Sequence, residues 1–503
     1  MARLKLKKLE TPHAVSYILV ASMSSWLEKL AAKPQRSILL LSLLLLLAGN
    51  WILPLTDRDE TRFAEASREM LQRGDYVVPW FNGAWRFDKP VLIYWCQMAS
   101  YKLLGVNDFA ARLPSVLFTA ATALLLVRWG RKYADAKTAF IAGAMFVAGL
   151  HVAIIGRVAT ADMAMVFFST LAVWSGWELT RPEQAQRKMW WWIFYVTLAL
   201  GFLAKGPVAW LPLGGMILGR ALRKESFWLP LMETLVGLVV TMALAACWGI
   251  PALTQTNGEF LKVGLGEHVI HRSTGVNDGH GLAGLFGFIA LLPLYFVTFF
   301  VSFFPWSTRL PSALRRWWPE RKRDDIGWYL LLQAALVFAS FSLVRTKLPH
   351  YTMPAFPCIA LWLALQLGRK GNAFAWFSKR LAAMAVFVLA LTLVGTSIFK
   401  SFLLTEKLWR EAKPHVRPET RIGCFGYTEP SLVWKFRGIS TNLVTLGEPK
   451  QALDFLTNAP PFILVLPTGE LAKLPVTNGL QIRVRGLDMV RFKNRDLTAI
   501  VRP

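Results

Sequence analysis

The chain has 503 residues, of which 54% are hydrophobic and only 17% are charged. A soluble protein of this length would carry a larger charged fraction. The apolar residues also gather in long blocks, and the run from Ser37 to Leu55 is long enough to cross a hydrocarbon core of roughly 30 Å as a helix. The composition therefore predicts a polytopic membrane protein.

The formal net charge of +26 would suit a nucleic-acid-binding protein, but the positions of the basic residues exclude that class. They gather in short loops between apolar blocks, for example around Arg131, Arg223 and Arg321, and they occupy every second loop. Cytoplasmic loops of membrane proteins carry this excess of Lys and Arg. The charge therefore indicates topology, and no nucleic-acid partner is expected.

Residues 1–36 begin with several lysines and precede the first strong apolar block, so we interpret them as a retained cytoplasmic leader. Residues 37–402 form the predicted membrane domain. An odd number of spans after a cytoplasmic N-terminus would place the end of the chain outside. We predict about eleven spans, near residues 37–55, 110–127, 138–155, 163–180, 189–204, 207–219, 228–250, 283–304, 327–344, 352–368 and 381–402.

Two regions outside these spans are long enough to carry structure of their own. The first outer loop, residues 56–109, has two stretches with apolar residues at helical spacing, which predicts two amphipathic helices along the membrane surface. Residues 403–503 are of mixed polarity, and segments 462–466 and 481–492 are typical of strands. We predict a small extracytoplasmic α/β domain there.

Asp59 follows the first span at a position typical of a helix N-cap. The carboxylate either caps the helix or acts on an acceptor as a base or an orienting charge, and the local pattern allows both. Several cations also fall on the predicted outer face, where the charge rule leaves few. One alternative is that they reach the interface as isolated side chains, but together they favour a phosphate site. They are Arg62, Lys89, Lys205, Arg272 and Lys347.

Carboxylates and histidines near the outer face also allow a divalent metal ion, because both ligand types suit such ions. Asp88, Glu267, His268 and His271 are the candidates, although no HxxxH or HExxH motif accompanies them. His350, in the segment KLPHY, is interpreted as structural or solvated.

Six short segments, in this order along the chain, resemble those of a known family. They are similar to the aminoarabinose transferases that modify lipid A and to related bacterial protein-mannosyltransferase-like glycosyltransferases. The resemblance covers nearly all of residues 50–360. Its motifs are DRDETRFAEASREM, FDKPVLIYW, RVATADMAM, FLAKGPVAW, GEHVIHR and RTKLPHYTMP.

The resemblance implies a polytopic all-α fold of GT-C type and an inverting transfer from an undecaprenyl-phosphate sugar. It implies that Asp59 and Asp162 are the acidic residues of the active site and that Arg62 lies in a phosphate cavity. Lys89, Lys205 and Tyr351 would bind the donor phosphate. Asp88 and His268 match positions that hold a divalent, zinc-like ion.

We therefore predict an enzyme of the bacterial inner membrane, with its active site facing the periplasm and with lipid A or a related envelope component as acceptor. A glycosyltransferase with a hydroxyl acceptor on a protein or glycan is the alternative within the same class. From another class, a transporter or flippase for a lipid-linked sugar would show paired halves and interrupted spans, and neither pattern is clear in this sequence.

Overall fold

The structure is a computed structural model of the chain. It describes residues 27–55, 58–181, 185–222, 231–264, 266, 289, 291–369, 373–439, 443–474 and 479–503.

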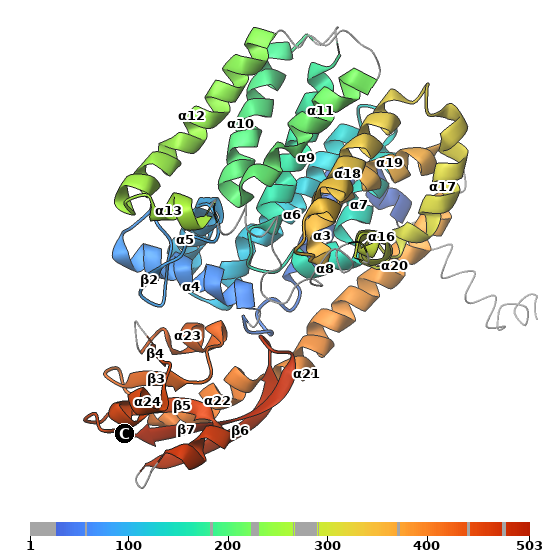
Figure 1. The fold of residues 1–503 in the computed structure, drawn as a ribbon. Coiled ribbons are helices and arrows are strands. Elements are labelled where there is room, and N and C mark those ends of the chain that lie inside the picture. Colours follow the sequence, from blue (N-terminus) through green and yellow to red (C-terminus); the bar gives the residue numbers. More distant parts are fainter. Residues whose placement is uncertain are drawn as a thin grey trace, which may run out of the picture.

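A bundle of helices makes up most of the molecule, with α4 and α5 at one end and a separate C-terminal domain beyond them (Figure 1). A described helix overlaps each of the predicted spans. Five are long and apolar enough to cross a membrane by length and composition: Asp108–Gly130, Leu231–Gln255, Asp325–Leu343, Pro349–Gly368 and Phe374–Lys400. The number of crossings stays a prediction.

The described helices of the bundle fall into two sets along the chain. The first half comprises α3 (Pro34–Leu47), α6 (Asp108–Gly130), α7 (Ala136–Val147), α8 (Leu150–Ile155), α9 (Asp162–Leu179), α10 (Arg187–Lys205), η1 (Pro207–Trp210), α11 (Leu211–Leu222), α12 (Leu231–Gln255) and α13 (Glu259–Leu261). The second half comprises α16 (Leu294–Ser302), η3 (Trp306–Arg309), α17 (Leu310–Trp317), η4 (Trp318–Glu320), α18 (Asp325–Leu343), η5 (Pro349–Ala355), α19 (Phe356–Gly368), α20 (Ala373–Ala390), η6 (Leu391–Gly395) and α21 (Thr396–Lys400).

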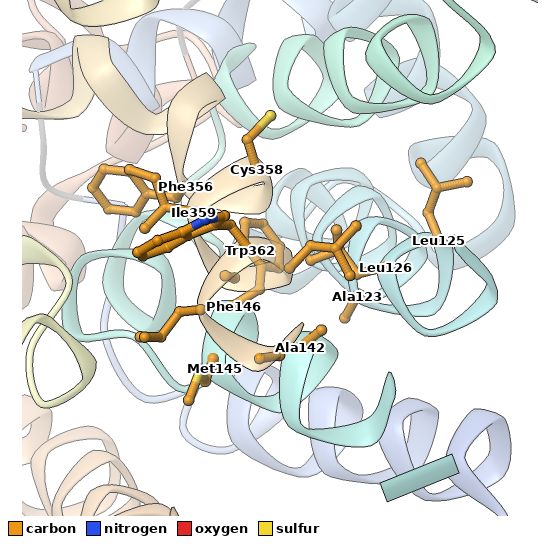
Figure 2. Close-up of a cluster of buried hydrophobic side chains, with 14 of the residues drawn as sticks. Ala123, Leu125, Leu126, Ala142, Met145, Phe146, Phe356, Cys358, Ile359 and Trp362 are labelled. Carbon is orange, nitrogen blue, oxygen red and sulfur yellow. The ribbon is translucent and has the colours of Figure 1, made fainter. Parts of the chain in front are cut away.

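The packing core of the bundle lies where α6, α7 and α19 meet (Figure 2). Leu126, Phe146 and Trp362 are buried there. Small residues let the helix backbones approach, as is common in membrane helices. A Cβ at Gly143 would lie 2.9 Å from the carbonyl oxygen of Ala123, so a larger residue there would push α7 away from α6.

Helices α4 (Arg58–Arg73) and α5 (Leu92–Leu104) occupy the predicted outer loop and are joined through a hairpin of β1 (Trp80–Phe81) and β2 (Ala84–Trp85). The apolar face of α4, with Phe63 and Met70, packs against α5. Its other side is also covered, because α23 of the C-terminal domain lies against it. As a result Glu65 is fully buried, which amphipathic spacing alone did not indicate.

The C-terminal domain is built on a five-stranded sheet with the order β4-β3-β5-β7-β6. Strands β3, β4 and β5 are parallel, whereas β7 runs antiparallel to β5 and β6. The mostly helical bundle with this small α/β domain confirms the predicted fold class. The elements are α22 (Leu404–Ala412), η7 (Lys413–His415), β3 (Arg421–Phe425), α23 (Pro430–Phe436), β4 (Val444–Leu446), α24 (Pro449–Leu456), β5 (Phe462–Pro467), η8 (Thr468–Lys473), β6 (Leu480–Asp488) and β7 (Lys493–Arg502).

One predicted strand is shorter than its sequence pattern suggested. Strand β6 ends at Asp488, not near Phe492. The Asp488 carboxylate accepts hydrogen bonds from the backbone N–H groups of Val490 at 2.9 Å and Arg491 at 3.0 Å. These bonds make a turn, since an Asp side chain commonly bonds to backbone just ahead of it, and the chain reverses into β7.

The C-terminal domain and the outer loop lie on the same side of the bundle (Figure 1). The Asn82 side chain, in the hairpin, donates to the carbonyl of Leu443 at 2.8 Å and accepts from its N–H at 2.7 Å. The Trp434 indole donates to Asp108 at 2.7 Å. These contacts dock the domain on the segments that carry the candidate site.

Candidate active site

The antiparallel pair α9 and α10 brings one predicted acidic residue and one predicted phosphate-binding cation together. Asp162 begins α9 and Lys205 ends α10, so each side chain has the charge that its helix terminus favours. The two form a hydrogen-bonded ion pair, and the Thr160 hydroxyl donates to the other carboxylate oxygen at 2.8 Å. Gly206, with φ +79°, ends α10 directly after Lys205, which directs the chain into η1.

A third segment, η5, reaches the same ion pair. His350 Nε2 lies 3.9 Å from the Asp162 carboxylate, and the His350 and Tyr351 rings are 5.0 Å apart. The Lys205 ammonium lies 5.5 Å from the centre of the Tyr351 ring. The predicted residues Asp162, Lys205 and Tyr351 are therefore brought together, from three separate parts of the chain.

The start of α4 is anchored beside this cluster by a buried ion pair. The Arg112 guanidinium bonds the Glu60 carboxylate through two parallel contacts of 2.6 and 2.8 Å, a strong and directional arrangement. Glu60 also accepts from the backbone N–H of Ala159 at 3.0 Å. It therefore ties α4 to the loop that leads into Asp162. Asp59 precedes Glu60 in the first turn of α4, one residue inside the helix and not at its cap.

Asp59 is exposed, and it lies close enough to Arg86 and to His350 to interact with both electrostatically. Arg86 is buried and pairs with Asp88 at 2.8 Å. Its Nε donates to the Tyr94 hydroxyl at 3.3 Å. Burial raises the pKa of Tyr94 to about 12, so this hydroxyl stays neutral at physiological pH.

Lys89 follows Asp88 and also interacts electrostatically with His350. Arg62 lies one turn after Asp59 on α4 and is half-buried. The acids Asp59 and Asp162 thus share one region with cations from the α4, hairpin and α10 segments. Such a mixture suits the transfer of a group from a phosphate, because cations stabilise the leaving group and a carboxylate handles the acceptor.

A cavity of about 250 Å³ adjoins this cluster. Asp88, Lys89 and Lys205 line it on one side. Its other walls are apolar and come from α10, α12 and α13, with Phe87 and Phe260 in edge-to-face contact at 5.6 Å. They are formed by Phe87, Pro90, Phe202, Gly206, Pro207, Trp248, Gly249, Leu253, Phe260, Leu261 and Gly264.

A larger cavity of about 1160 Å³ lies between α4 and the C-terminal domain, away from this cluster. None of the predicted site residues lines it. Two of its cations are engaged by carboxylates, Arg68 with Glu65 and Lys435 with Glu406. Size alone therefore does not identify the active site.

Three predicted site residues, Lys347, His268 and Arg272, are not part of the cluster around Asp162 and Lys205. Lys347 is buried, and its ammonium donates to the carbonyls of Phe341 and Ser342 at the end of α18. It also lies 5.6 Å from the Tyr295 ring centre. These contacts resemble helix capping by a basic residue. His268 and Arg272 lie outside the residues that the structure describes.

Of the two residues of the predicted metal site, Asp88 lies among the residues that the structure describes. Asp88 is already paired with the Arg86 guanidinium at 2.8 Å, and a metal ion would compete with that cation. No group of three or more His, Cys, Asp or Glu suited to a metal is found among the described residues. The described residues therefore do not by themselves fit a metal ion.

Sequence reasoning missed two contributors to the cluster. The sequence favours a structural or solvated His350, yet its Nε2 atom lies 3.9 Å from the Asp162 carboxylate and its ring centre 5.0 Å from that of Tyr351. Arg86 orients Asp88 and lies near Asp59. The sequence offered one signal for both residues, which is that they lie beside predicted site residues in the chain. Arg86 directly precedes the segment FDKP, and His350 belongs to TKLPHY.

Known proteins match the chain in sequence. A family described as dolichyl-phosphate-mannose-protein mannosyltransferase matches residues 88–250. An undecaprenyl phosphate-alpha-4-amino-4-deoxy-L-arabinose arabinosyl transferase of Pectobacterium carotovorum is 31% identical over 333 residues, covering 64% of this chain and 58% of the relative. The chain thus spans little more than half the length of that relative. An uncharacterised protein of Aquifex aeolicus is 29% identical, covering 73% of this chain and 80% of the relative.

Solved structures share the fold. The ArnT structure from Cupriavidus metallidurans bound to undecaprenyl phosphate matches with a TM-score of 0.75 at 17% identity, covering 95% of this chain and 98% of that one. The oligosaccharyltransferase AglB from Archaeoglobus fulgidus matches with a TM-score of 0.51 at 13% identity, covering 88% and 70%. The architecture is that of a GT-C type membrane protein. The chain is thus similar to undecaprenyl phosphate-alpha-4-amino-4-deoxy-L-arabinose arabinosyl transferases, and one segment of it matches the dolichyl-phosphate-mannose-protein mannosyltransferase family.

Proposed function

We propose that the protein is an inverting glycosyltransferase that moves a sugar from undecaprenyl phosphate to lipid A or a related envelope acceptor. The observation that carries the proposal is the assembly of Asp59, Asp162, Lys89, Lys205 and Tyr351, from separate segments, beside one partly apolar cavity. The names of the arabinosyl transferase relatives and the undecaprenyl phosphate in the ArnT structure support the choice of donor.

The cavity has the two kinds of surface that a polyprenyl phosphate needs. Lys89 and Lys205 would bind the phosphate, and the wall formed by Phe202, Leu253 and Phe260 would contact the first isoprene units. An ammonium group has three N–H donors, so Lys205 can hold Asp162 and a phosphate oxygen together. Each charge-assisted hydrogen bond contributes about 1.5–3 kcal/mol.

The transfer is a single displacement at the anomeric carbon. An acceptor oxygen forms the new bond while the bond to the phosphate oxygen breaks, and the electron pair leaves with the polyprenyl phosphate. The cations stabilise the negative charge that develops there, so no covalent nucleophile is required. An acceptor phosphate attacks as an anion that Asp59 orients, whereas an acceptor hydroxyl would transfer its proton to the Asp59 carboxylate.

We further propose that the active site faces the periplasm of a bacterial inner membrane. Basic loops alternate along the chain, and the outer loop and the C-terminal domain share one side of the bundle. Labelling of single cysteines in intact cells tests this. Positions 84, in the loop near Arg86, and 450 are exposed and should react with a membrane-impermeant reagent, whereas position 321 should not. Labelling of 321 together with 450 would contradict the topology.

A divalent, zinc-like ion bound by Asp88 and His268 remains a separate proposal. Its support is the chemistry of the two residue types, and the step described above does not use it. Metal analysis of the purified protein, with Asp88→Asn and His268→Ala variants, tests it. Binding near one equivalent in the parent protein and loss in both variants would support the site.

The deciding experiment for the proposed function supplies purified protein with one of two donors and follows sugar transfer to lipid A. Transfer from undecaprenyl phosphate-linked sugar, and none from a nucleotide sugar, is expected. Activity with the nucleotide sugar alone would overturn the proposal. Movement of the lipid-linked sugar across vesicles without any transfer would instead favour a transporter.

A further inference from the structure

A second, smaller cavity lies beneath the start of α4, at the outer end of the bundle. Its volume is about 180 Å³. It opens between the end of α3, helix α8 and the π-helical segment η6, which belong to the membrane domain. Its walls are formed by Gly49, Asn50, Leu53, Glu60, Arg112, Leu150, Ala153, Ile154, Arg157, Val158, Val388, Leu391, Thr392 and Thr396.

Asn50 is the first sign that this cavity receives a ligand. The residue is only 2% exposed, and neither its side-chain nitrogen nor its side-chain oxygen has a hydrogen-bond partner among the residues that the structure describes. A buried amide without partners is costly, and such groups in folded proteins call for an explanation. Asn50 offers two donors and one acceptor to whatever enters the cavity.

Arg157 is the second sign, because its charge has no carboxylate partner among the described residues. Its guanidinium donates to three backbone carbonyls, including those of Ala153 at 3.0 Å and Ala48 at 2.8 Å. Carbonyl oxygens bear no formal charge. Arg112, on the opposite wall, is instead neutralised by Glu60. The cavity therefore keeps one positive charge, which an anionic ligand would balance.

The rim of the cavity is apolar and turned toward the membrane side of the bundle. Ile154 is 43% exposed and Leu391 is 41% exposed. Both belong to segments of the membrane domain, so their exposed surface suits hydrocarbon chains. A ligand that fills this site must join an anionic, hydroxyl-bearing head to an apolar tail.

The cavity also adjoins the catalytic cluster. Glu60, in its wall, is the neighbour of Asp59 in the first turn of α4. Val158 lines it as well, and the chain continues from there to Thr160 and Asp162, which bond each other. A ligand bound here would thus lie beside both predicted acids, on a different side from the donor cavity.

We propose that this cavity binds the phosphorylated sugar headgroup of the acceptor lipid, with the phosphate toward Arg157 and a sugar hydroxyl or amide on Asn50. The inference rests on the proposed function. The acyl chains would leave between α8 and η6, and the headgroup would meet the donor sugar at Asp59.

Asn50 offers a sharp test, because removing an amide that bonds nothing should not weaken the fold. Asn50→Ala should keep the Tm and the donor affinity of the parent protein while raising the KM and Kd for lipid A about five- to tenfold. Asn50→Asp would place a second negative charge opposite the ligand phosphate, so its acceptor KM should rise further. Phosphorylated and enzymatically dephosphorylated lipid A serve as probes, and the parent protein should prefer the former.

Ser42 provides the matched control. It is buried on α3, its hydroxyl also lacks a hydrogen-bond partner in the described part of the chain, and it does not line the cavity. Ser42→Ala should leave both substrates' KM values unchanged. If the parent protein transfers sugar but both Asn50 variants have the same KM and Kd for lipid A as the parent, the inference is overturned. Absence of transfer by the parent protein would instead remove the proposed function, so the two failures are distinguishable.

Discussion

The outer end of the bundle and the C-terminal domain both bury polar side chains, but their surroundings differ. In the bundle, Asp162 and Lys205 form an ion pair beside an open cavity. In the C-terminal domain, Glu429 accepts from Tyr427 and from Thr405 at 3.1 Å, and Thr405 bonds Ser431 at 2.8 Å. The second network is closed, with its partners inside the domain.

This difference distinguishes polar groups that are available to a ligand from polar groups that stabilise the packing of a domain. A closed network satisfies its own donors and acceptors and makes one arrangement of the core unique. Charges that face a cavity keep donors available for a ligand, at a cost to stability that function explains. We therefore expect the largest losses of activity from the bundle and mainly effects on positioning or stability from the C-terminal domain.

The strongest test of the comparison is Asp59→Asn. Removing the carboxylate that orients or deprotonates the acceptor should lower kcat about 10²- to 10⁴-fold, with donor binding nearly unchanged. Initial rates of sugar transfer measure the effect. Asp454→Asn, at an exposed site on α24, is the control and should retain full activity. Turnover near that of the parent protein in folded Asp59→Asn would exclude Asp59 from catalysis.

Lys89→Ala addresses the donor. Loss of one charge-assisted bond of about 1.5–3 kcal/mol should weaken undecaprenyl phosphate binding about ten- to hundredfold. Binding is measured directly with the purified protein, independently of the acceptor. Lys450→Ala, an exposed lysine of the C-terminal domain, should not change the affinity. An unchanged Kd for Lys89→Ala would remove this residue from the phosphate site.

Asn82 tests whether the C-terminal domain positions the donor-binding segment. Its two bonds to Leu443 hold the hairpin that leads to Arg86, Asp88 and Lys89. Asn82 has φ +53°, so Asn82→Gly removes the side chain without straining the backbone. We expect the donor KM to rise about threefold to fivefold, with a smaller change in kcat. A lowered Tm with an unchanged donor KM would show that the contact is structural only.

The smallest effect is expected for the pH dependence of the C-terminal domain. Burial, helped by the nearby Asp488, raises the pKa of Glu429 above its usual value of 4.5. The folded domain then binds a proton more readily than the unfolded chain, so stability falls as the pH rises from about 4.5 through the folded pKa. Glu429→Gln should flatten this slope, changing Tm on the order of 2 °C. Melting curves of the parent protein and of Glu429→Gln at several pH values measure this effect. If the two proteins show the same dependence of Tm on pH, Glu429 does not titrate in this range.

Much of the site could be predicted from the sequence, because several of its residues are charged and lie at one end of an apolar block. Lys205 is charged at the end of an apolar block, next to Gly206 and Pro207, and Asp162 begins another block. The environment of His350 had no such signal. A single histidine is compatible with many environments, and only the packing of η5 against α9 brings it to Asp162.

Lys347 illustrates the opposite case. Its position in the chain resembles that of the other outer cations, yet its described contacts are with the last carbonyls of α18 and with the Tyr295 ring. The direction of a long side chain depends on the nearest unsatisfied acceptors. Sequence order does not contain that information.

Hydropathy and charge are local properties of each segment and can be read without knowing its neighbours in space. The sequence by itself therefore determined the membrane class, the helical segments, the small C-terminal α/β domain and the motifs that resemble the family. The tertiary structure alone decided which charges meet, that Asp88 pairs with Arg86 and that α4 is covered on both sides. It also decided that Asn50 lines a cavity and has no hydrogen-bond partner among the described residues. Those features depend on helix crossings and side-chain directions, which arise from packing between segments far apart in the chain.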